Sequence, residues 1–189
     1  MNVLVLYSST EGQTKKIAER VASEIDGRGR NATTYDMGSE QKAPSISDFD
    51  AVIVAASVHQ GFHQESAVNF VAAQRERLKS RKAAFLSVSL SAAMPDGKAE
   101  AQGYVDRFVE ATGWTPDASL SVAGAVRLSS YDYFERQVMK YIIARKGIVH
   151  DADVDYECTD WPELEAFVET FLASDRKPVA TSVAMHSSR

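Results

Sequence analysis

Near its N-terminus the chain carries an apolar run, Val3-Leu4-Val5-Leu6-Tyr7, that leads directly into a hydroxyl-rich turn, Ser8-Ser9-Thr10-Glu11-Gly12-Gln13-Thr14. A pattern of apolar residues with helical spacing follows from Lys15. A buried strand, a short turn with one glycine and a helix bring hydroxyl groups and free backbone N–H groups together at a helix N-terminus, which attracts a phosphate. The sequence therefore predicts an anion-binding site in the first crossover.

The turn lacks the features of two common phosphate-binding motifs. A P-loop needs a glycine five residues before Gly12 and a lysine after it, and a dinucleotide fingerprint needs three glycines, of which only Gly12 is present. Residues Ser9–Thr14 instead resemble the Ser/Thr-x-Thr-Gly-x-Thr loop of flavodoxins, with Glu11 where flavodoxins usually have threonine. The plainer alternative is that Ser9 or Thr10 only caps a helix.

The composition predicts one globular domain, which we place at residues 1–174. A chain of 189 residues with 44% hydrophobic and 25% charged residues can bury one sizeable core. Its net charge of −5 argues against a nucleic-acid partner. Its single cysteine, Cys158, excludes an internal disulfide and a multi-cysteine metal site, and its four histidines show no metal-binding spacing, so we expect no metal.

We expect a cytoplasmic protein. The residues after Met1-Asn2 lack the pattern of a signal peptide, and no apolar run approaches the roughly 18 residues of a membrane span. Residues 175–189 carry no apolar period, so we expect them to form a flexible tail.

The order of apolar patterns predicts an α/β fold with a doubly wound, five-stranded parallel sheet. Helical patterns alternate with the strands, one closing at Gly113 and the last starting near Thr159-Asp160. In such sheets ligands bind beyond the carboxyl ends of the strands. The expected strands are residues 3–6, 31–37, 51–56, 83–89 and 120–126.

Residues 127–148, between the fifth strand and the final helix, form a helical insert that a minimal sheet of this kind does not need. Tyr131, Phe134, Val138 and Tyr141 fall on one helical face. The insert has five basic residues against two acidic ones, a net charge of +3 in an acidic chain. This composition indicates an anionic, apolar partner such as a substrate or a membrane surface. The alternative is an extra core helix or a subunit contact.

Several short motifs resemble the flavodoxin-type bacterial protoporphyrinogen oxidases, the menaquinone-dependent protoporphyrinogen IX dehydrogenases. The similarity runs from Met1 to about Leu172 and departs from the family at His59 and Gln60, where an arginine and an aromatic are typical. The motifs are Tyr7-Ser8-Ser9, Gly12-Gln13-Thr14, Ala55-Ala56-Ser57-Val58 with Gly61, Phe85-Leu86-Ser87-Val88, Val122-Ala123-Gly124-Ala125 with Arg127, Tyr131-Asp132 and Thr159-Asp160-Trp161.

The resemblance implies FMN held by three loops. The first loop, residues 9–14, would bind the phosphate. The second, residues 57–62, and the third, residues 87–91, would flank the isoalloxazine, and Phe62 is the better candidate to stack on it. Both tryptophans, Trp114 and Trp161, are expected to pack in the structure instead. The implied FMN-binding residues are Ser9, Thr10, Glu11, Gly12, Gln13 and Thr14; Ser57, Val58, His59, Gln60, Gly61 and Phe62; and Ser87, Val88, Ser89, Leu90 and Ser91.

The resemblance also implies oxidation of protoporphyrinogen IX in haem biosynthesis, with menaquinone or ubiquinone as acceptor and peripheral contact with the inner face of the cell membrane. Arg127, Arg136 and Arg145, with Tyr131, would bind the porphyrinogen, because guanidinium groups match its carboxylates. Surface solvation is the alternative for each arginine. We assign no catalytic acid or base.

The loop histidines His59 and His63 are the nearest candidates for proton exchange, but we expect them to be hydrogen-bonding surface groups. Three other functions fit the scaffold: an NAD(P)H:quinone reductase, an electron carrier of the flavodoxin kind and a scaffold without FMN. The basic insert argues against the electron carrier, and no nicotinamide signature supports the reductase. A homo-oligomer is left open.

Overall fold

The structure is a computed structural model that describes residues 1–94, 96–126 and 156–174. Five strands form a parallel sheet with the order β2-β1-β3-β5-β6, which confirms the predicted fold class. The chain passes outward from β1 to β2 and then returns to the other side of β1, so the order reverses between β1 and β3. The strands are β1 (Asn2–Ser8), β2 (Asn31–Asp36), β3 (Ala51–His59), β5 (Lys82–Ser89) and β6 (Ala118–Ala123).

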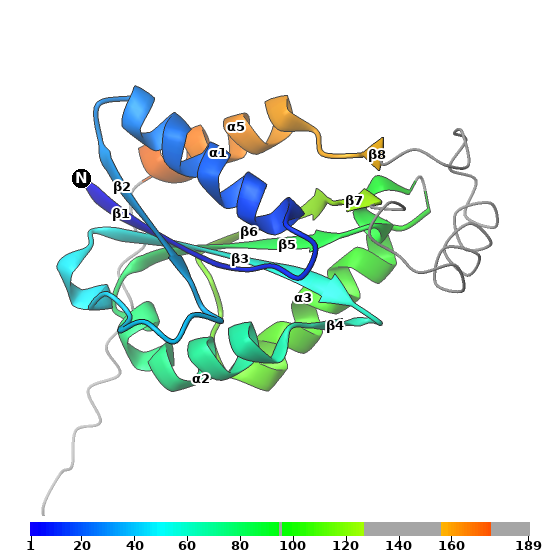
Figure 1. Ribbon diagram of the computed structural model, residues 1–189, viewed down its shortest axis with the longest axis horizontal. Helices are drawn as coiled ribbons and strands as arrows, with labels where there is room; N and C mark the ends of the chain where they lie inside the picture. Colours follow the sequence, from blue (N-terminus) through cyan, green and yellow to red (C-terminus); the bar gives the residue numbers. More distant parts are fainter. Residues whose placement is uncertain (95, 127–155, 175–189) are drawn as a thin grey trace, which may run out of the picture.

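Among the described residues, four helices cover the sheet in two pairs, one pair on each face (Figure 1). α1 and α5 lie on one face, and α2 and α3 lie on the other. Two short 3-10 helices, η1 (Ile46–Asp48) and η2 (Ser91–Ala93), follow β2 and β5. The helices are α1 (Gln13–Gly27), α2 (Glu65–Lys79), α3 (Lys98–Thr112) and α5 (Trp161–Ala173).

The apolar run of β1 is explained by this two-sided cover. Val3 and Val5 point into the core beneath α1 and α5, whereas Leu4 and Leu6 point into the core beneath α2 and α3. All four side chains are fully buried. A central strand of a parallel sheet therefore needs apolar residues at every position rather than at alternate ones.

Two predicted segments were wrong in detail. The polar loop expected after residue 56 is the end of β3, which turns back as an antiparallel hairpin with β4 (Phe62–His63). The fifth strand expected at 120–126 is divided at Gly124 into β6 and a separate strand, β7 (Ala125–Val126), which pairs with β8 (Tyr156–Glu157). Strand pairing replaced the loop because the β-branched Val58 continues β3, and Val58 and His59 pair with His63 and Phe62.

The predicted helix ends were right. Gly113 closes α3 in the left-handed conformation, with φ 64°, and α5 starts directly after Asp160. Trp114 is fully buried, with its ring nearly perpendicular to that of Phe85, so its packing role is confirmed. The predicted insert, 127–148, and the predicted tail, 175–189, lie outside the described residues.

Candidate cofactor-binding site

The first predicted loop joins β1 to α1 at the carboxyl end of the sheet. Gly12 occupies the N-cap position of α1 with φ 88°, a conformation that favours glycine. Its amide donates to Ser9 Oγ at 3.0 Å, and its carbonyl accepts the first helical bond, from Lys16 N at 3.0 Å. No side chain caps the helix, and its first turn holds no acidic residue. The amides of Gln13 and Thr14 are therefore left without a side-chain acceptor among the described residues.

The two residues after Gly12 are buried and play different parts. Thr14 is 1% exposed. The Gln13 side chain turns away to donate from Nε2 to Thr159 Oγ1 at 2.9 Å, and the Thr159 hydroxyl donates to the Ala123 carbonyl at 2.7 Å. Gln13 thus joins α1 to the segment before α5, and its backbone N–H is the group it can offer to an anion.

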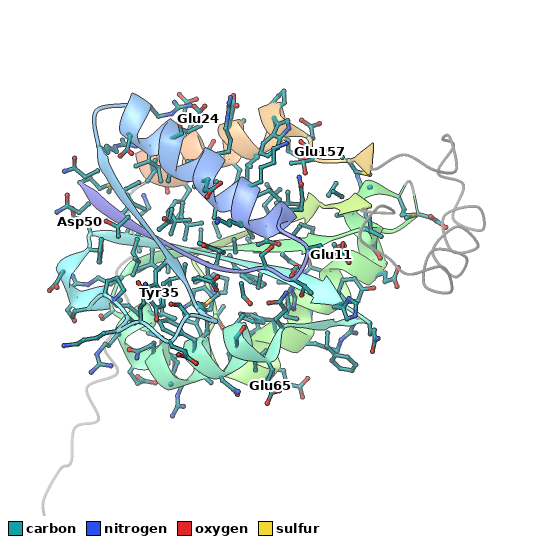
Figure 2. The ribbon with its side chains drawn as sticks, in the orientation of Figure 1. Glu11, Glu24, Tyr35, Asp50, Glu65 and Glu157 are labelled. Atoms are coloured by element: carbon teal, nitrogen blue, oxygen red, sulfur yellow. The ribbon has the colours of Figure 1, made fainter. Side chains whose placement is uncertain are left out.

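Two labelled glutamates mark this edge of the molecule (Figure 2). Glu11 lies in the first loop and Glu157 in β8, both at the end of the sheet opposite Asp50. Glu157 forms an ion pair with Lys16 and accepts from Trp161 Nε1 at 2.7 Å. Burial acts to raise the pKa of Glu157, but these hydrogen bonds outweigh it and hold the pKa below its usual value. Glu157 therefore connects the end of β8 to α1 and to the start of α5.

The second predicted segment contributes one hydroxyl to the same edge. Ser57, near the end of β3, is half-buried, and its Oγ lies 2.7 Å from Gln64 Nε2. Gln64 also bonds the side chains of Thr10 and Ser8, so it connects the first loop with the end of β3. Sequence reasoning missed Gln64. The signal that could have found it is its place immediately before the second crossover helix.

The hairpin turn lies beyond these hydroxyls. Gln60 and Gly61 have positive φ angles, 50° and 87°, the pattern of a two-residue type I′ turn. Arg107 of α3 donates from Nη2 to the Gly61 carbonyl at 3.0 Å, and its guanidinium lies 5.8 Å from the centre of the Phe62 ring. Phe62 is 68% exposed, and His59 is also exposed. The turn is held against α3, and one side of the Phe62 ring faces Arg107 while most of the ring is exposed.

His63 is a core residue, which corrects the expectation of a surface group. It is 8% exposed, and its ring lies 4.9 Å from that of Phe108, centre to centre. Its Nε2 lies 2.9 Å from Ser87 Oγ. Burial, followed by the positive charge of Arg107, lowers the pKa of His63 to about 4, so the ring is neutral at pH 7. The strand pairing of Val58 with His63 turns this side chain inward.

The third predicted segment is the buried end of β5 and the turn into η2. Ser91 Oγ donates to Glu100 Oε2 at 2.8 Å, and Ser89 Oγ accepts from Ala92 N at 3.3 Å. A Cβ at Gly97 would lie 1.9 Å from the Ser91 carbonyl oxygen, so the loop closes tightly on itself. Val88 is buried as well, and Leu90 is half-buried. The Ser91 hydroxyl therefore ties the turn to α3, and the Ser89 hydroxyl holds the turn itself.

The predicted substrate residues, Arg127, Tyr131, Arg136 and Arg145, lie outside the described residues. Within residues 1–94, 96–126 and 156–174, no cluster of three or more His, Cys, Asp or Glu side chains could hold a metal ion. None of the helices in these ranges is long and apolar enough to cross a bilayer.

A family model described as a flavodoxin domain matches residues 4–153. The chain belongs to this family. Protoporphyrinogen IX dehydrogenase [quinone] of Escherichia coli K12 is 30% identical to it over 179 residues, which are 94% of this chain and 98% of the relative. The protein of the same name from Leishmania major is 26% identical, over 95% of this chain and 80% of that one. The predicted resemblance is confirmed.

Solved structures agree on the fold. Oxidised flavodoxin 1 from Bacillus cereus superimposes with a TM-score of 0.52 and 16% identity, over 91% of this chain and 97% of that one. At this identity the similarity supports the doubly wound architecture alone.

Proposed function

We propose that this chain is an FMN-dependent dehydrogenase that oxidises protoporphyrinogen IX to protoporphyrin IX and passes the electrons to a quinone. The observation that carries the proposal is the 30% identity with the Escherichia coli dehydrogenase over nearly the whole of both chains. The flavodoxin of known structure reaches only 16% over a similar share. The chain is therefore closer in sequence to a dehydrogenase than to that flavodoxin.

The donor set at the first loop fits a phosphate monoester such as that of FMN. It offers the uncapped amides of α1, the buried Thr14 and the hydroxyls of Ser9 and Thr10. A helix N-terminus stabilises an anion by about 0.3–1 kcal/mol even when exposed, and hydrogen bonds from several donors add to this. Bound FMN would supply the two-electron chemistry, accepting electrons from the reduced substrate and releasing them to the acceptor.

The remaining predicted FMN residues would flank the isoalloxazine. The hairpin end, from Ser57 to Phe62, and the segment from Ser87 to Ser91 lie at the carboxyl ends of two neighbouring strands, β3 and β5. The exposed ring of Phe62 is the group best placed to stack on a flat ligand. Neutral, buried His63 supports this wall through Ser87 and exchanges no proton with the substrate in our proposal.

The substrate and the acceptor would meet the site from the side of the insert. Arg127, Arg136 and Arg145, with Tyr131, would pair with porphyrinogen carboxylates. A menaquinone or ubiquinone is lipid-soluble, so the same proposal places the protein in the cytoplasm, in peripheral contact with the inner face of the cell membrane. The anionic membrane surface suits the +3 charge of residues 127–148.

An anaerobic assay tests the proposal. Purified protein loaded with FMN is mixed with protoporphyrinogen IX and a soluble quinone, and porphyrin fluorescence is followed. We expect quinone-dependent turnover, and no turnover when the quinone is left out. Replacing residues 129–147 by a short linker should abolish turnover while FMN stays bound.

Three results would overturn parts of this proposal. Rapid oxidation of NADH or NADPH with no reaction of the porphyrinogen would favour the reductase alternative. Unchanged turnover after replacement of the insert would remove its role in substrate binding. Electron transfer to protein acceptors alone, without porphyrin formation, would favour the flavodoxin-like carrier.

A further inference from the structure

The Gln64 side chain joins three elements at the edge of the sheet where the strand order reverses. It lies at the N-cap position of α2 and bonds Ser8 at the end of β1, Thr10 in the first loop and Ser57 in β3. We propose that Gln64 is a positioning residue for the anion site, which directs the hydroxyl of Thr10 toward a bound phosphate. The inference rests on the proposed binding of FMN.

The donors and acceptors of this network can be assigned one by one. The two protons of the Gln64 amide go to Thr10 Oγ1 and to Ser57 Oγ, the latter at 2.7 Å. The Gln64 carbonyl accepts the single hydroxyl proton of Ser8. Ser8 Oγ lies 2.7 Å from Ser66 Oγ, and because Ser8 has already given its proton, Ser66 is the donor.

This assignment leaves the hydroxyl proton of Thr10 without an acceptor among the described residues. Ser57 Oγ donates to the Ser8 carbonyl at 3.5 Å, the outer limit of a hydrogen bond. Thr10 accepts from Gln64, and no acceptor for its own proton is found among the described residues. Thr10 is exposed, whereas Gln64 is half-buried behind it. The Thr10 hydroxyl is therefore held as a donor, facing away from Gln64 and available to an anion.

The amide also suits a doubly charged ligand better than a carboxylate would. A glutamate at position 64 could only accept, so it would draw the protons of Thr10 and Ser57 toward itself and place a negative charge beside the phosphate. The neutral amide instead polarises both hydroxyls in the donating sense. By fixing the first loop to β3, it also reduces the ordering cost of binding.

The decisive comparison is between FMN and riboflavin, which differ only in the phosphate. Apoprotein is titrated with each flavin by fluorescence quenching, in the wild type and in the variants Gln64→Met and Gln64→Glu. Losing a donor to an ionised phosphate weakens binding by about tenfold or more. We expect about that loss of FMN affinity in Gln64→Met and at least about a hundredfold loss in Gln64→Glu. Riboflavin affinity should stay within about twofold in Gln64→Met.

The matched control is Gln74→Glu, which makes the same charge change on the same helix beside Arg77 and should leave FMN affinity unchanged. A second arm replaces Thr10 by Val alone and together with Gln64→Met. If Gln64 acts through Thr10, the double variant binds FMN about as well as Thr10→Val alone. This arm remains informative if Gln64→Glu fails to fold.

Three results would overturn the inference. Equal losses for FMN and riboflavin in Gln64→Met would show that Gln64 only maintains the loop. Fully additive losses in the double variant would show that it does not act through Thr10. Wild-type affinity of Gln64→Glu for FMN would exclude the assigned direction of the hydrogen bonds. A wild-type chain that binds neither flavin would instead overturn the proposed function, and this inference with it.

Discussion

The helices α1 and α5 cover the same face of the sheet, joined by an ion pair of 2.5 Å between Arg20 and Glu165, yet their N-termini are built in opposite ways. α5 begins at an aspartate, Asp160, whose Oδ1 accepts from Glu163 N at 3.0 Å. Pro162 lies in its first turn and removes a further unpaired N–H. α1 begins at a glycine, with no side-chain cap and no acid in its first turn.

The difference is that a side chain of the chain itself caps the N-terminus of α5, whereas none caps that of α1, where we propose that an anion binds. Both helices carry the same partial positive charge at their N-termini. α5 neutralises it with Asp160 and Glu163, both at the start of the helix. α1 offers hydroxyls instead, from Ser9 and the buried Thr14. A helix N-terminus with hydroxyl donors and no acid in its first turn favours an external anion.

The largest expected effect comes from giving α1 the kind of cap that α5 has. Ser9→Asp would place a carboxylate where Ser9 Oγ now accepts from Gly12 N. We expect the apoprotein to gain about 0.3–1 kcal/mol of unfolding free energy, because a negative charge near a helix N-terminus interacts favourably with the helix dipole. FMN affinity should fall at least about a hundredfold, because two anions would compete for one helix N-terminus.

Urea unfolding and a flavin titration measure these two effects of Ser9→Asp in the same preparation. The expected result is a higher unfolding free energy together with a lower FMN affinity. A variant that keeps wild-type FMN affinity would show that the phosphate does not lie at this helix.

A smaller effect is expected from the protonation of His63 in β4. Because the pKa of His63 in the folded protein, about 4, is below its ordinary value of 6.5, protons bind more readily to the unfolded chain. The stability contributed by neutral His63 is present above pH 6.5 and is lost as the pH falls toward 4. Between pH 7 and pH 5 we expect a loss of about 2 kcal/mol.

Chemical unfolding at both pH values, compared with His63→Gln, isolates this histidine. Glutamine does not titrate and can still bond Ser87, so the variant should lose about 2 kcal/mol less between the two pH values. The control is His59→Gln, which replaces an exposed histidine. Equal pH dependence in the wild type and His63→Gln would contradict the neutral, buried state.

Prediction from sequence succeeded where one local pattern decides the structure. The apolar run at Val3, the glycine at Gly113 and the Asp160 start of α5 each act through nearby backbone geometry, so they could be predicted from the sequence. The hairpin after Ser57 could not, because a strand extension and a polar loop have the same residue types here.

The next prediction asks how much one donor of the α1 terminus contributes. Thr14→Val keeps the shape of a side chain that is 1% exposed and removes its hydroxyl. We expect FMN affinity to fall about tenfold, the effect of one hydrogen bond to a charged group. The control is Thr170→Val on α5, whose hydroxyl donates to the Ala166 carbonyl at 2.8 Å and should not affect FMN. Undiminished affinity in Thr14→Val would remove Thr14 from the site.

The site itself was only partly predictable, for a physical reason. The hydroxyls of the first loop are local to one turn, but the partners that orient them come from far along the chain. Gln64 reaches Thr10 across 54 positions, and Thr159 reaches Gln13 across 146. No spacing rule connects such pairs, so the sequence predicted an anion-binding turn but not the distant residues that hold the side chains of that turn in place.

The smallest effect is expected at the capped N-terminus of α5. Asp160→Ala removes the cap of α5 and leaves the Glu163 amide without its acceptor. We expect a loss of about 1 kcal/mol in unfolding free energy, and FMN affinity should be unchanged because this cap serves its own helix. Asp160→Asn is the matched control, since asparagine caps about as well as aspartate. A lower FMN affinity in folded Asp160→Ala would contradict this expectation. It would mean that the start of α5 affects the start of α1 through the hydrogen bond between Thr159 and Gln13.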